Sequence, residues 1–248
     1  MEVHHHAHTA RKKWTHYFWE FFMLFLAVTL GFFVENQREH YVEHQRERQF
    51  IQSLFNDIKA DTTNLSRIIN ARTRKEHALD SLSQMVNSDS TIFFSKQIYF
   101  YAVSVARTFQ YRLVPNDGTL QQLKNSGALR LIRKPDVVDS IAKYDVNTRN
   151  LLGQWTVEES LINVYRDAAT KIFDALIFDQ MLDENANVVR LPTGNPDLQP
   201  NYRQNLYEWN YRIYGIKTIN KANRRDLKLL LQQANNLLTI LKKEYHLK

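Results

Sequence analysis

Residues 14–34 read WTHYFWEFFMLFLAVTLGFFV, and this apolar stretch divides the chain into two parts. At about 1.5 Å of rise per residue, a helix of this length extends roughly 31 Å, close to the ~30 Å thickness of a bilayer's hydrocarbon core. Trp14, Tyr17 and Trp19 stand at its start, where amphipathic rings favour the headgroup layer. The stretch therefore predicts a single transmembrane helix.

The residues on either side of this stretch predict its orientation. Arg11, Lys12 and Lys13 precede it, and basic segments stay on the cytoplasmic side, so residues 1–13 are predicted to form a His-rich, basic cytoplasmic tail. The stretch runs directly into polar residues without a small-residue cleavage site, which favours an uncleaved anchor over a signal peptide. We therefore expect a single-pass protein of the inner, cytoplasmic membrane, with residues 35–248 in the periplasm.

Composition limits the classes of function and of partner. The chain has 248 residues, a formal net charge of +7 and no cysteine, which excludes a disulfide framework and thiolate chemistry. The basic character of the extracytoplasmic part favours a solvated surface with a mild excess of Lys and Arg, the alternative is a surface for anionic headgroups or an acidic protein, and nucleic acid is not expected there. The predicted partners are the lipid bilayer and either a second copy of the chain or a partner membrane protein, and no cofactor is predicted.

The rest of the chain predicts an all-α fold. Residues 35–50 are polar nearly all round, as is typical of a solvated stalk helix that continues from the membrane. Long segments without glycine or proline follow, so residues 51–248 are predicted to form an antiparallel bundle of four to five helices. Residues 185–201 hold three of the five prolines and predict a long loop that is either functional or mobile.

The first bundle helix has an apolar seam with polar interruptions. Asp61, Arg72 and Lys75 occupy positions in the same register as the apolar residues, which makes a long dimeric coiled coil less favoured than a bundle helix. The apolar residues recur at a spacing of 3.5, at Ile51, Leu54, Ile58, Leu65, Ile68, Leu79, Leu82 and Val86.

Further helices follow from periodicity and from turn residues. An aromatic core helix is predicted over residues 91–108, and Thr119 is predicted to cap a short helix that Gly127 ends. Pro135 is predicted to open a helix that reaches residue 182, with a possible break at Gly153. Two last helices are predicted, one over residues 207–214 and one with a seam of Leu227, Leu230, Ala234, Leu238, Leu241 and Tyr245.

Two blocks of sequence carry a resemblance to a known group of proteins. They are EFFMLFLAVTLGFFVENQREH with the following RERQFIQSL, and GTLQQLKNSGALRLIRKPDVVDSIAKYD, which contains an LKxSGxLxLI element at residues 123–132. With these blocks the chain resembles the domain-of-unknown-function, single-pass membrane proteins common in Bacteroidota. The resemblance implies an N-terminal anchor followed by a helical region, and it brings no activity and no catalytic residue.

One string in the stalk matches a catalytic motif. His40, Glu43 and His44 form the H-x-x-E-H pattern of inverted zinc proteases, in which two histidines bind zinc and the glutamate acts as base. Hydrolysis also requires a third ligand and a walled cleft, whereas this segment is polar throughout. The favoured interpretation is a solvated stalk in a protein that is not an enzyme and has no metal site, and a zinc-dependent hydrolase is the alternative.

One stripe of the predicted membrane helix combines a carboxylate with small residues. Glu20, Leu24, Ala27 and Gly31 fall on one face, and Ala27 and Gly31 form a small-xxx-small pair that lets two helices approach closely. This stripe is the predicted membrane-helix interface. The alternative is a lipid-facing stripe in which Glu20 extends to the interface.

A basic cluster occupies the C-terminal part of the chain, at Arg212, Lys217, Lys221, Arg224, Arg225 and Lys228. It predicts either a solvated helix face or a patch for phosphate or lipid headgroups. The overall hypothesis is a membrane-anchored helical interaction or scaffold protein, a subunit of an envelope complex. The alternatives are an extracytoplasmic sensor and an accessory subunit of a transport or motor complex.

Overall fold

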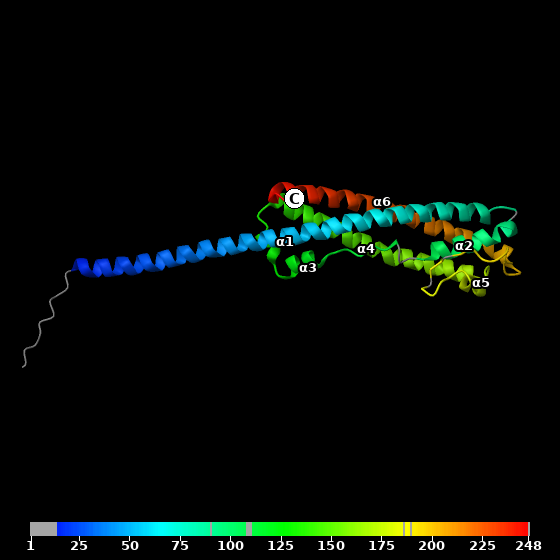
Figure 1. Ribbon diagram of the computed structural model, residues 1–248, viewed down its shortest axis with the longest axis horizontal. Helices are drawn as coiled ribbons and strands as arrows, with labels where there is room; N and C mark the ends of the chain where they lie inside the picture. Colours follow the sequence, from blue (N-terminus) through cyan, green and yellow to red (C-terminus); the bar gives the residue numbers. More distant parts are fainter. Residues whose placement is uncertain (1–13, 90, 108–110, 186, 189, 248) are drawn as a thin grey trace, which may run out of the picture. The chain divides into compact units, whose positions relative to one another are not determined.

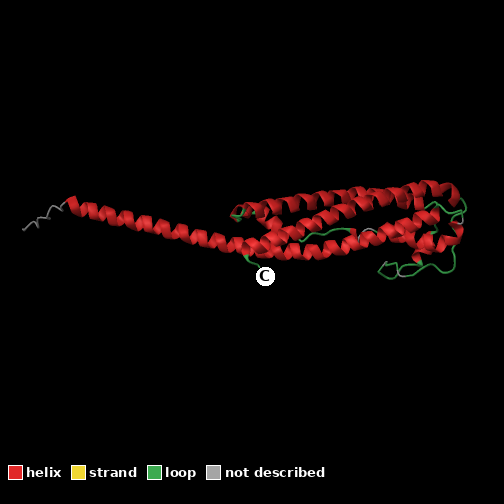
Figure 2. Cartoon of the chain, turned by 90° about the horizontal axis from the view of Figure 1, so that it is seen from above, coloured by secondary structure: helices red, strands yellow, loops and turns green. Residues whose placement is uncertain are grey.

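The protein is all-α, as predicted from the sequence. The computed structural model describes residues 14–89, 91–107, 111–185, 187–188 and 190–247, and within these ranges it contains helices, loops and one isolated bridge between Leu182 and Val188 (Figure 2). The predicted tail, residues 1–13, lies outside the described residues. The α-helices are α1 (Trp14–Val86), α2 (Ser95–Ala106), α3 (Gly118–Asn125), α4 (Pro135–Ala169), α5 (Ala175–Asp179) and α6 (Tyr202–Tyr245).

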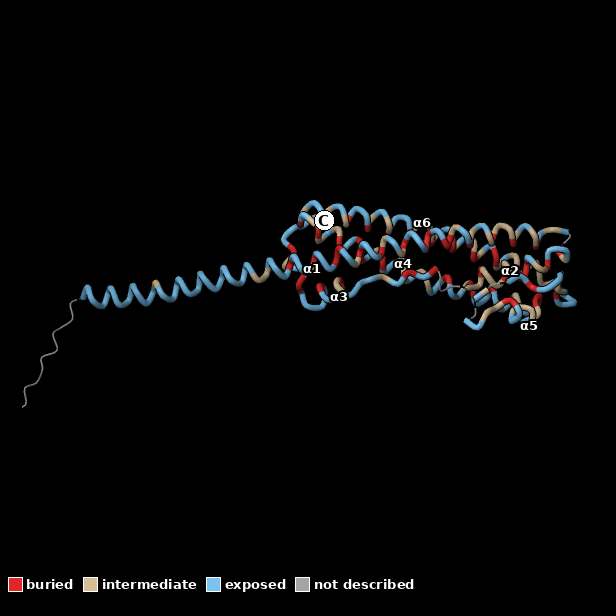
Figure 3. The backbone as a smooth tube through the Cα atoms, in the orientation of Figure 1, coloured by how far each residue is buried: buried red, intermediate tan, exposed pale blue. Residues whose placement is uncertain are grey.

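The chain divides into two compact units, Met1–Phe50 and Ile51–Lys248. In the first unit the described residues belong to α1, which is helical through the apolar stretch and the polar segment that follows it. Among the described helices, α1 is the one long and apolar enough to cross a membrane, and none of its apolar window is buried (Figure 3). The window is therefore exposed in the described structure, and its length and apolar composition suit a membrane-spanning segment.

In the second unit, α1 and α4 run in the same direction. Tyr144 of α4 donates a hydrogen bond to Asp61 of α1 at 2.8 Å, and further along both helices Glu158 pairs with Arg72 at 2.8 Å. The two helices therefore advance together along the bundle (Figure 1).

Helix α6 runs antiparallel to α4. Asn147 donates a hydrogen bond to Gln233 at 2.8 Å, whereas Gln154, two turns later on α4, donates to Asp226, two turns earlier on α6, at 3.0 Å. The two predicted C-terminal helices are wrong as separate elements, because α6 continues from residue 202 to residue 245 without interruption. Its buried seam passes through Leu237, and Leu238 is half-buried.

The chain returns from the end of α1 to the start of α4 through an interrupted helical segment, which contains α2 and α3. Tyr165 of α4 donates a hydrogen bond to the carbonyl of Ala102 in α2, and Lys124 of α3 pairs with Asp145 earlier on α4. Helices α2 and α3 are joined by residues 107–117, of which the described parts, 107 and 111–117, are mostly without helical structure. The described part of the bundle therefore has three long helices, α1, α4 and α6. The fourth position is filled by α2, the non-helical segment after it, and α3.

Three helix boundaries differ from the sequence prediction. Helix α4 begins at Pro135 as predicted, but it passes through Gly153 without a break and ends at Ala169, before the short helix α5. The aromatic helix begins at Ser95 after a turn of 3₁₀ helix over Thr91–Phe94. Thr119 lies inside α3, which begins one residue earlier, so it is not the cap.

Gly127 ends the α3 segment as predicted, with φ of 68° in the left-handed region where glycine is favoured. The predicted proline-rich loop is anchored to the bundle by Asn195. Its side-chain oxygen accepts hydrogen bonds from the Ser95 hydroxyl and the Lys96 N–H at the start of α2, and its amide donates to the carbonyl of Ile92.

Candidate functional site

The polar interruptions of the α1 seam form a buried ion-pair cluster with α4. Arg72 donates to both carboxylate oxygens of Glu158, at 3.2 and 2.8 Å, and Lys75 donates to the same carboxylate at 3.1 Å. All three side chains are buried. With both cations charged, this core cluster carries one excess positive charge, which is a costly arrangement in a low-dielectric interior.

Helix α6 supplies the remaining polar partners of this cluster. Asn223 donates to Glu158 at 2.7 Å, and Asn220 accepts from Arg72 at 3.1 Å and donates to the Arg72 backbone carbonyl at 3.0 Å. The ammonium of Lys75 also lies 4.5 Å from the centre of the Tyr111 ring, within the range of a cation–π interaction. The cluster thus joins α1, α4, α6 and the segment that follows α2.

Burial shifts the pKa values inside the cluster. Burial lowers the pKa of Lys75 to about 8, although the negative charge of Glu158 opposes this shift. Burial also tends to raise the pKa of Glu158, but the charge of Lys75 and the hydrogen bonds and charge of Arg72 outweigh it, so the pKa lies below its ordinary value. Glu158 is therefore ionised, and Lys75 is the group that titrates closest to neutral pH.

The segment 111–117 accounts for two of the polar residues in the α1 seam, Asp61 and Arg72. A chain segment without helical structure has no intrahelical partners for its backbone N–H and C=O groups, and here Tyr111 and Leu113 are buried whereas Arg112, Val114, Asn116 and Asp117 are exposed. Arg72 donates to the Tyr111 carbonyl at 3.1 Å, and Asp61 accepts from the Asn116 N–H at 2.9 Å. The polar side chains of α1 therefore replace the backbone partners that a helix would have provided.

Asp61 sits at the centre of a second buried polar group. Its carboxylate accepts from the Tyr144 hydroxyl and from the side-chain amide of Asn116, each at 2.8 Å, in addition to the Asn116 backbone. Burial, and then the charge of Asp61, raise the pKa of Tyr144 above its ordinary value, so this hydroxyl stays protonated and donates. The result is a satisfied network that fixes the extended segment on α1.

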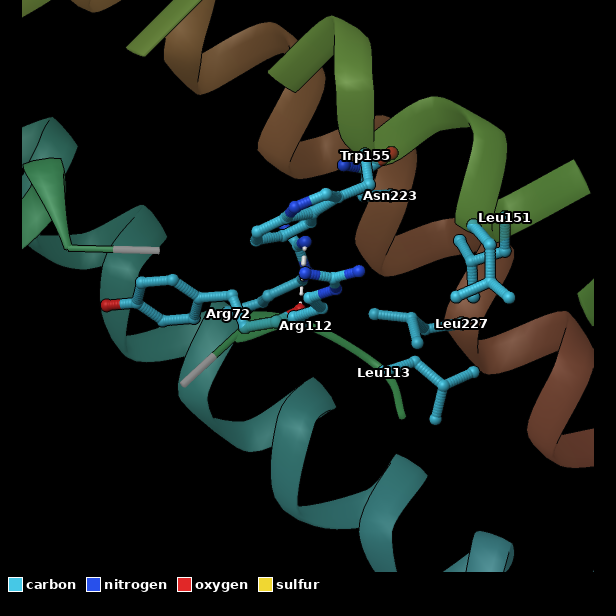
Figure 4. A pocket seen from close by; sticks show the side chains of 9 residues that line it. Arg72, Arg112, Leu113, Leu151, Trp155, Asn223 and Leu227 are labelled. Carbon is cyan, nitrogen blue, oxygen red and sulfur yellow. Dashed lines mark hydrogen bonds between the residues drawn. The ribbon is translucent and has the colours of Figure 1, made fainter. Parts of the chain in front are cut away.

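A small cavity adjoins the Arg72 cluster. It has a volume of about 20 Å³, which is room for a group of the size of a water molecule and not for an organic substrate. Figure 4 shows side chains from α1, α4, α6 and the segment after α2 around it; the lining residues are Arg72, Tyr111, Arg112, Leu113, Leu151, Leu152, Trp155, Asn223 and Leu227. The cluster around Arg72 therefore serves to link the helices of the bundle.

A larger, apolar hollow lies between α2, the end of α4, and α5. Its volume is about 350 Å³, and Arg166 and Thr170 are the polar residues among those that line it. Arg166 donates to the Ala106 carbonyl at 2.7 Å and to Asn163 at 3.3 Å, which places its guanidinium beside the hollow. The apolar lining consists of Ala102, Val103, Ala106, Tyr165, Ala169, Phe173, Ala175 and Phe178.

Of the H-x-x-E-H residues on α1, His40 and His44 are exposed and Glu43 is half-buried. His40 and Glu43 approach to 4.0 Å, and His44 pairs with Glu47 at 3.3 Å instead of facing His40 across a metal site. Within the described ranges, no group of three His, Cys, Asp or Glu side chains is placed to hold a metal ion. The geometry gives no support to the zinc hydrolase alternative.

The predicted membrane-helix interface is exposed along α1. Glu20, Leu24, Ala27 and Gly31 are all exposed, and a Cβ placed at Gly31 meets nothing within 4 Å. The structure adds one partner that the sequence analysis missed, because the His16 ring nitrogen Nε2 lies 3.1 Å from Glu20 Oε1. The i, i+4 spacing of the two residues is the signal that predicts this contact.

The basic cluster of α6 is largely paired with acidic residues. Lys217 pairs with Asp80, and Glu76 forms an ion pair with Arg224 at 2.9 Å and lies 3.7 Å from Lys221. Further pairs join Arg212 to Glu208 and Arg225 to Asp226. Several of these cations therefore tie α6 to α1, and the excess positive charge of the cluster is smaller than the sequence indicates.

Comparison of this chain with family models, with curated proteins and with solved structures finds no match. The geometry alone therefore carries the functional argument. In the described residues, the buried groups Lys75, Glu158, Tyr144 and Tyr165, whose pKa values are shifted, link helices, whereas Tyr99 forms hydrogen bonds with the backbone at Asp174 and Asp197. The surface hollows include the apolar hollow, the outer face of α6 and a hollow between α4 and α6.

Proposed function

We propose that this protein is a single-pass, membrane-anchored helical scaffold that binds a partner protein in the periplasm, as a subunit of an envelope complex. The observation that carries the proposal is the contrast between its two parts. The apolar window of α1 is exposed and suits lipid, whereas Arg72, Lys75 and Glu158 are joined inside the bundle and serve its architecture. A rigid helical body on a membrane anchor is suited to holding partners in place.

The orientation in this proposal rests on Arg11, Lys12 and Lys13, which favour a cytoplasmic N-terminus. Alkaline phosphatase and green fluorescent protein fused after Lys248 test it in opposite ways. We expect phosphatase activity and no fluorescence, because phosphatase folds in the periplasm and the exported fluorescent protein does not. Fluorescence without phosphatase activity, or recovery of the protein in the soluble fraction, contradicts the proposal.

A charge-swapped variant serves as the control for the reporter fusions. Replacing Arg11, Lys12 and Lys13 by glutamine while adding three lysines after Val34 should weaken or reverse the reporter signals. The same fusions with a conservative Arg11→Lys change should report as the wild type does. This comparison assigns the signal to the flanking charges and not to the reporter.

The apolar hollow favours a second candidate function, an extracytoplasmic sensor of an amphiphile. A volume of about 350 Å³ is at the lower end of ligand pockets, which are mostly apolar with a few polar groups that fix orientation. Arg166 beside the hollow favours an anionic head.

Sodium dodecanoate should raise the melting temperature of the full-length protein in micelles, dodecanol should raise it less, and Ala169→Phe should abolish the shift. Equal shifts in all samples contradict the sensor function.

A further inference from the structure

Three tyrosines form an exposed row on α6. Tyr207, Tyr211 and Tyr214 have 87, 67 and 64 % of their surface exposed, and their spacing of four and three residues places them on one face of the helix. Tyrosine rings are large and mostly apolar, so three of them exposed side by side differ from an ordinary solvated helix face. Tyrosine is enriched at protein interfaces, where its ring packs and its hydroxyl forms a hydrogen bond.

The same face continues into a basic groove. Lys221, Arg225 and Leu229 follow Tyr207, Tyr211 and Tyr214 along α6 at intervals that keep them on one side of a helix with 3.6 residues per turn. The groove has a volume of about 290 Å³ and is lined by Lys221, Arg224, Arg225, Lys228, Leu229 and Gln232. We call the continuous surface made of the three tyrosines and these groove residues the α6 outer stripe.

The groove carries more positive charge than its acidic neighbours compensate. Four cations line it, whereas the acids paired with them are Glu76, shared by Lys221 and Arg224, and Asp226, which pairs with Arg225. Two positive charges therefore remain in excess. A partner that fits the outer stripe presents carboxylates opposite the groove and apolar side chains opposite the tyrosines.

A lipid surface fits the outer stripe less well than a protein does. Helices that bind in a membrane interface insert a broad apolar face. The apolar face of α6, which includes Trp209, Ile213 and Leu227, is buried in the bundle, and the outer stripe offers Leu229 as its aliphatic residue. Narrow rows of aromatic and charged side chains instead match the spacing of residues along a second helix.

We propose that the α6 outer stripe is the docking surface for an acidic amphipathic helix of a partner protein. Apolar residues of that helix pack on Tyr207, Tyr211 and Tyr214, and its carboxylates enter the groove around Lys221, Arg225 and Lys228. The proposal deepens the scaffold function and rests on it, because it names the kind of partner that the scaffold holds.

Site-specific photocrosslinking in living cells tests the docking surface. The full-length protein carries p-benzoylphenylalanine at position 211, and matched samples carry it at Phe93 or Val157, which are exposed on other elements. Irradiation at position 211 should give an adduct whose crosslinked peptide, sequenced by mass spectrometry, is acidic and has helical periodicity. The yield at position 211 should exceed the yield at the two control positions at least tenfold.

Charge variants then separate docking from chance proximity. Replacing Lys221, Arg225 and Lys228 by glutamine should reduce the crosslink at position 211 at least tenfold, whereas Arg130→Gln with Lys143→Gln, at exposed sites off α6, should leave it within twofold. Far-ultraviolet circular dichroism checks that both variants stay folded. No adduct above the controls, an adduct with lipid or with a second copy of this chain, or a basic crosslinked peptide overturns the proposal. If one of these outcomes is found while the reporter fusions in the same cells keep the wild-type topology, this docking surface is wrong and the proposed membrane-anchored scaffold stands.

Discussion

Arg72 of α1 and Glu158 of α4, 86 residues apart in the sequence, meet in the core with two hydrogen bonds at 3.2 and 2.8 Å. The pair joins α1 and α4, which run in the same direction although the chain reverses between the end of α1 and the start of α4. Because Lys75 contacts the same carboxylate, a single acid compensates two buried cations. Removing the Glu158 carboxylate therefore leaves both cations buried without a counter-charge.

Glu158→Gln should destabilise the bundle by about 3–5 kcal/mol, because it leaves Arg72 and Lys75 buried without a counter-charge. Glu159→Gln is the matched control, since Glu159 is the exposed neighbour on the same helix and its loss should cost less than about 0.5 kcal/mol. Chemical denaturation followed by circular dichroism measures both. Equal midpoints for the two variants contradict this role of Glu158.

Stability should rise with pH between about 8 and 10. The pKa of Lys75 is about 8 in the folded protein and near 10.5 when the chain is unfolded, so in this window the unfolded state binds more protons. The folded state is therefore favoured as pH rises, by about 2 kcal/mol at pH 10. Thermal melts of the wild type and of Lys75→Met, which removes the titrating group, check this. The variant should lose the increase, and an unchanged pH dependence in the variant assigns the effect to other groups.

Asp61→Ala should release the extended segment 111–117 from α1. The change leaves the buried Tyr144 hydroxyl without its acceptor, which costs about 1–3 kcal/mol, and it removes the acceptor of the Asn116 N–H. Hydrogen exchange at the Asn116 amide should become at least tenfold faster than in the wild type. Asp57→Ala, about one turn earlier on the same helix, is the control and should leave that amide protected.

The sequence predicts helices well in this chain because most of them show their periodicity in apolar residues. It also predicts the left-handed turn at Gly127, since that conformation has a clear residue preference. It does not predict that Arg72 and Lys75 meet Glu158. Glu158 occupies a core position of α4, four residues before Ile162, and this spacing is the local signal that the acid is buried. Its partners come from distant parts of the chain.

Asp61 and Arg72, the polar interruptions of the α1 seam, show why a periodic apolar pattern alone does not predict how the helix packs. In the sequence they weaken a helix-packing pattern, but in the structure they bind the backbone of residues 111–117. Their role depends on a tertiary feature, the non-helical segment between α2 and α3, that no short window of sequence reveals. The His16 contact of Glu20 is different, because i, i+4 spacing makes it visible in the sequence.

Two glycine substitutions should shift stability in opposite directions. Gly127 has φ of 68°, so Gly127→Ala places a Cβ in an unfavourable left-handed conformation and should destabilise the protein by about 1 kcal/mol. Gly153 lies inside α4 with no atom within 4 Å of an added Cβ, so Gly153→Ala should stabilise it by about 0.5–1 kcal/mol through helix propensity. Denaturation midpoints of the two variants test the pair. Shifts of the same sign contradict the left-handed conformation of Gly127 or the open helical site of Gly153.

The stripe of Glu20, Leu24, Ala27 and Gly31 remains a predicted interface with another membrane helix. In lipid no hydrophobic force drives helices together, so close contact across small residues and a shared polar group must supply the attraction. Gly31→Leu adds bulk where the helices would touch, and Glu20→Gln keeps the shape of the side chain but removes its charge at the contact with His16. The two changes therefore separate packing from electrostatics.

Disulfide crosslinking in native membranes measures this interface, and the chain contains no cysteine that would interfere. A cysteine introduced at Leu24 should crosslink a second copy of the chain, whereas one at Leu26, on a different side of the helix, should not. Gly31→Leu should reduce the Leu24 crosslink at least tenfold, and Glu20→Gln should reduce it less if packing dominates. Equal crosslinking from both positions, or a Leu24 crosslink that persists with Gly31→Leu, means that the stripe faces lipid and that Glu20 with His16 extends to the membrane interface.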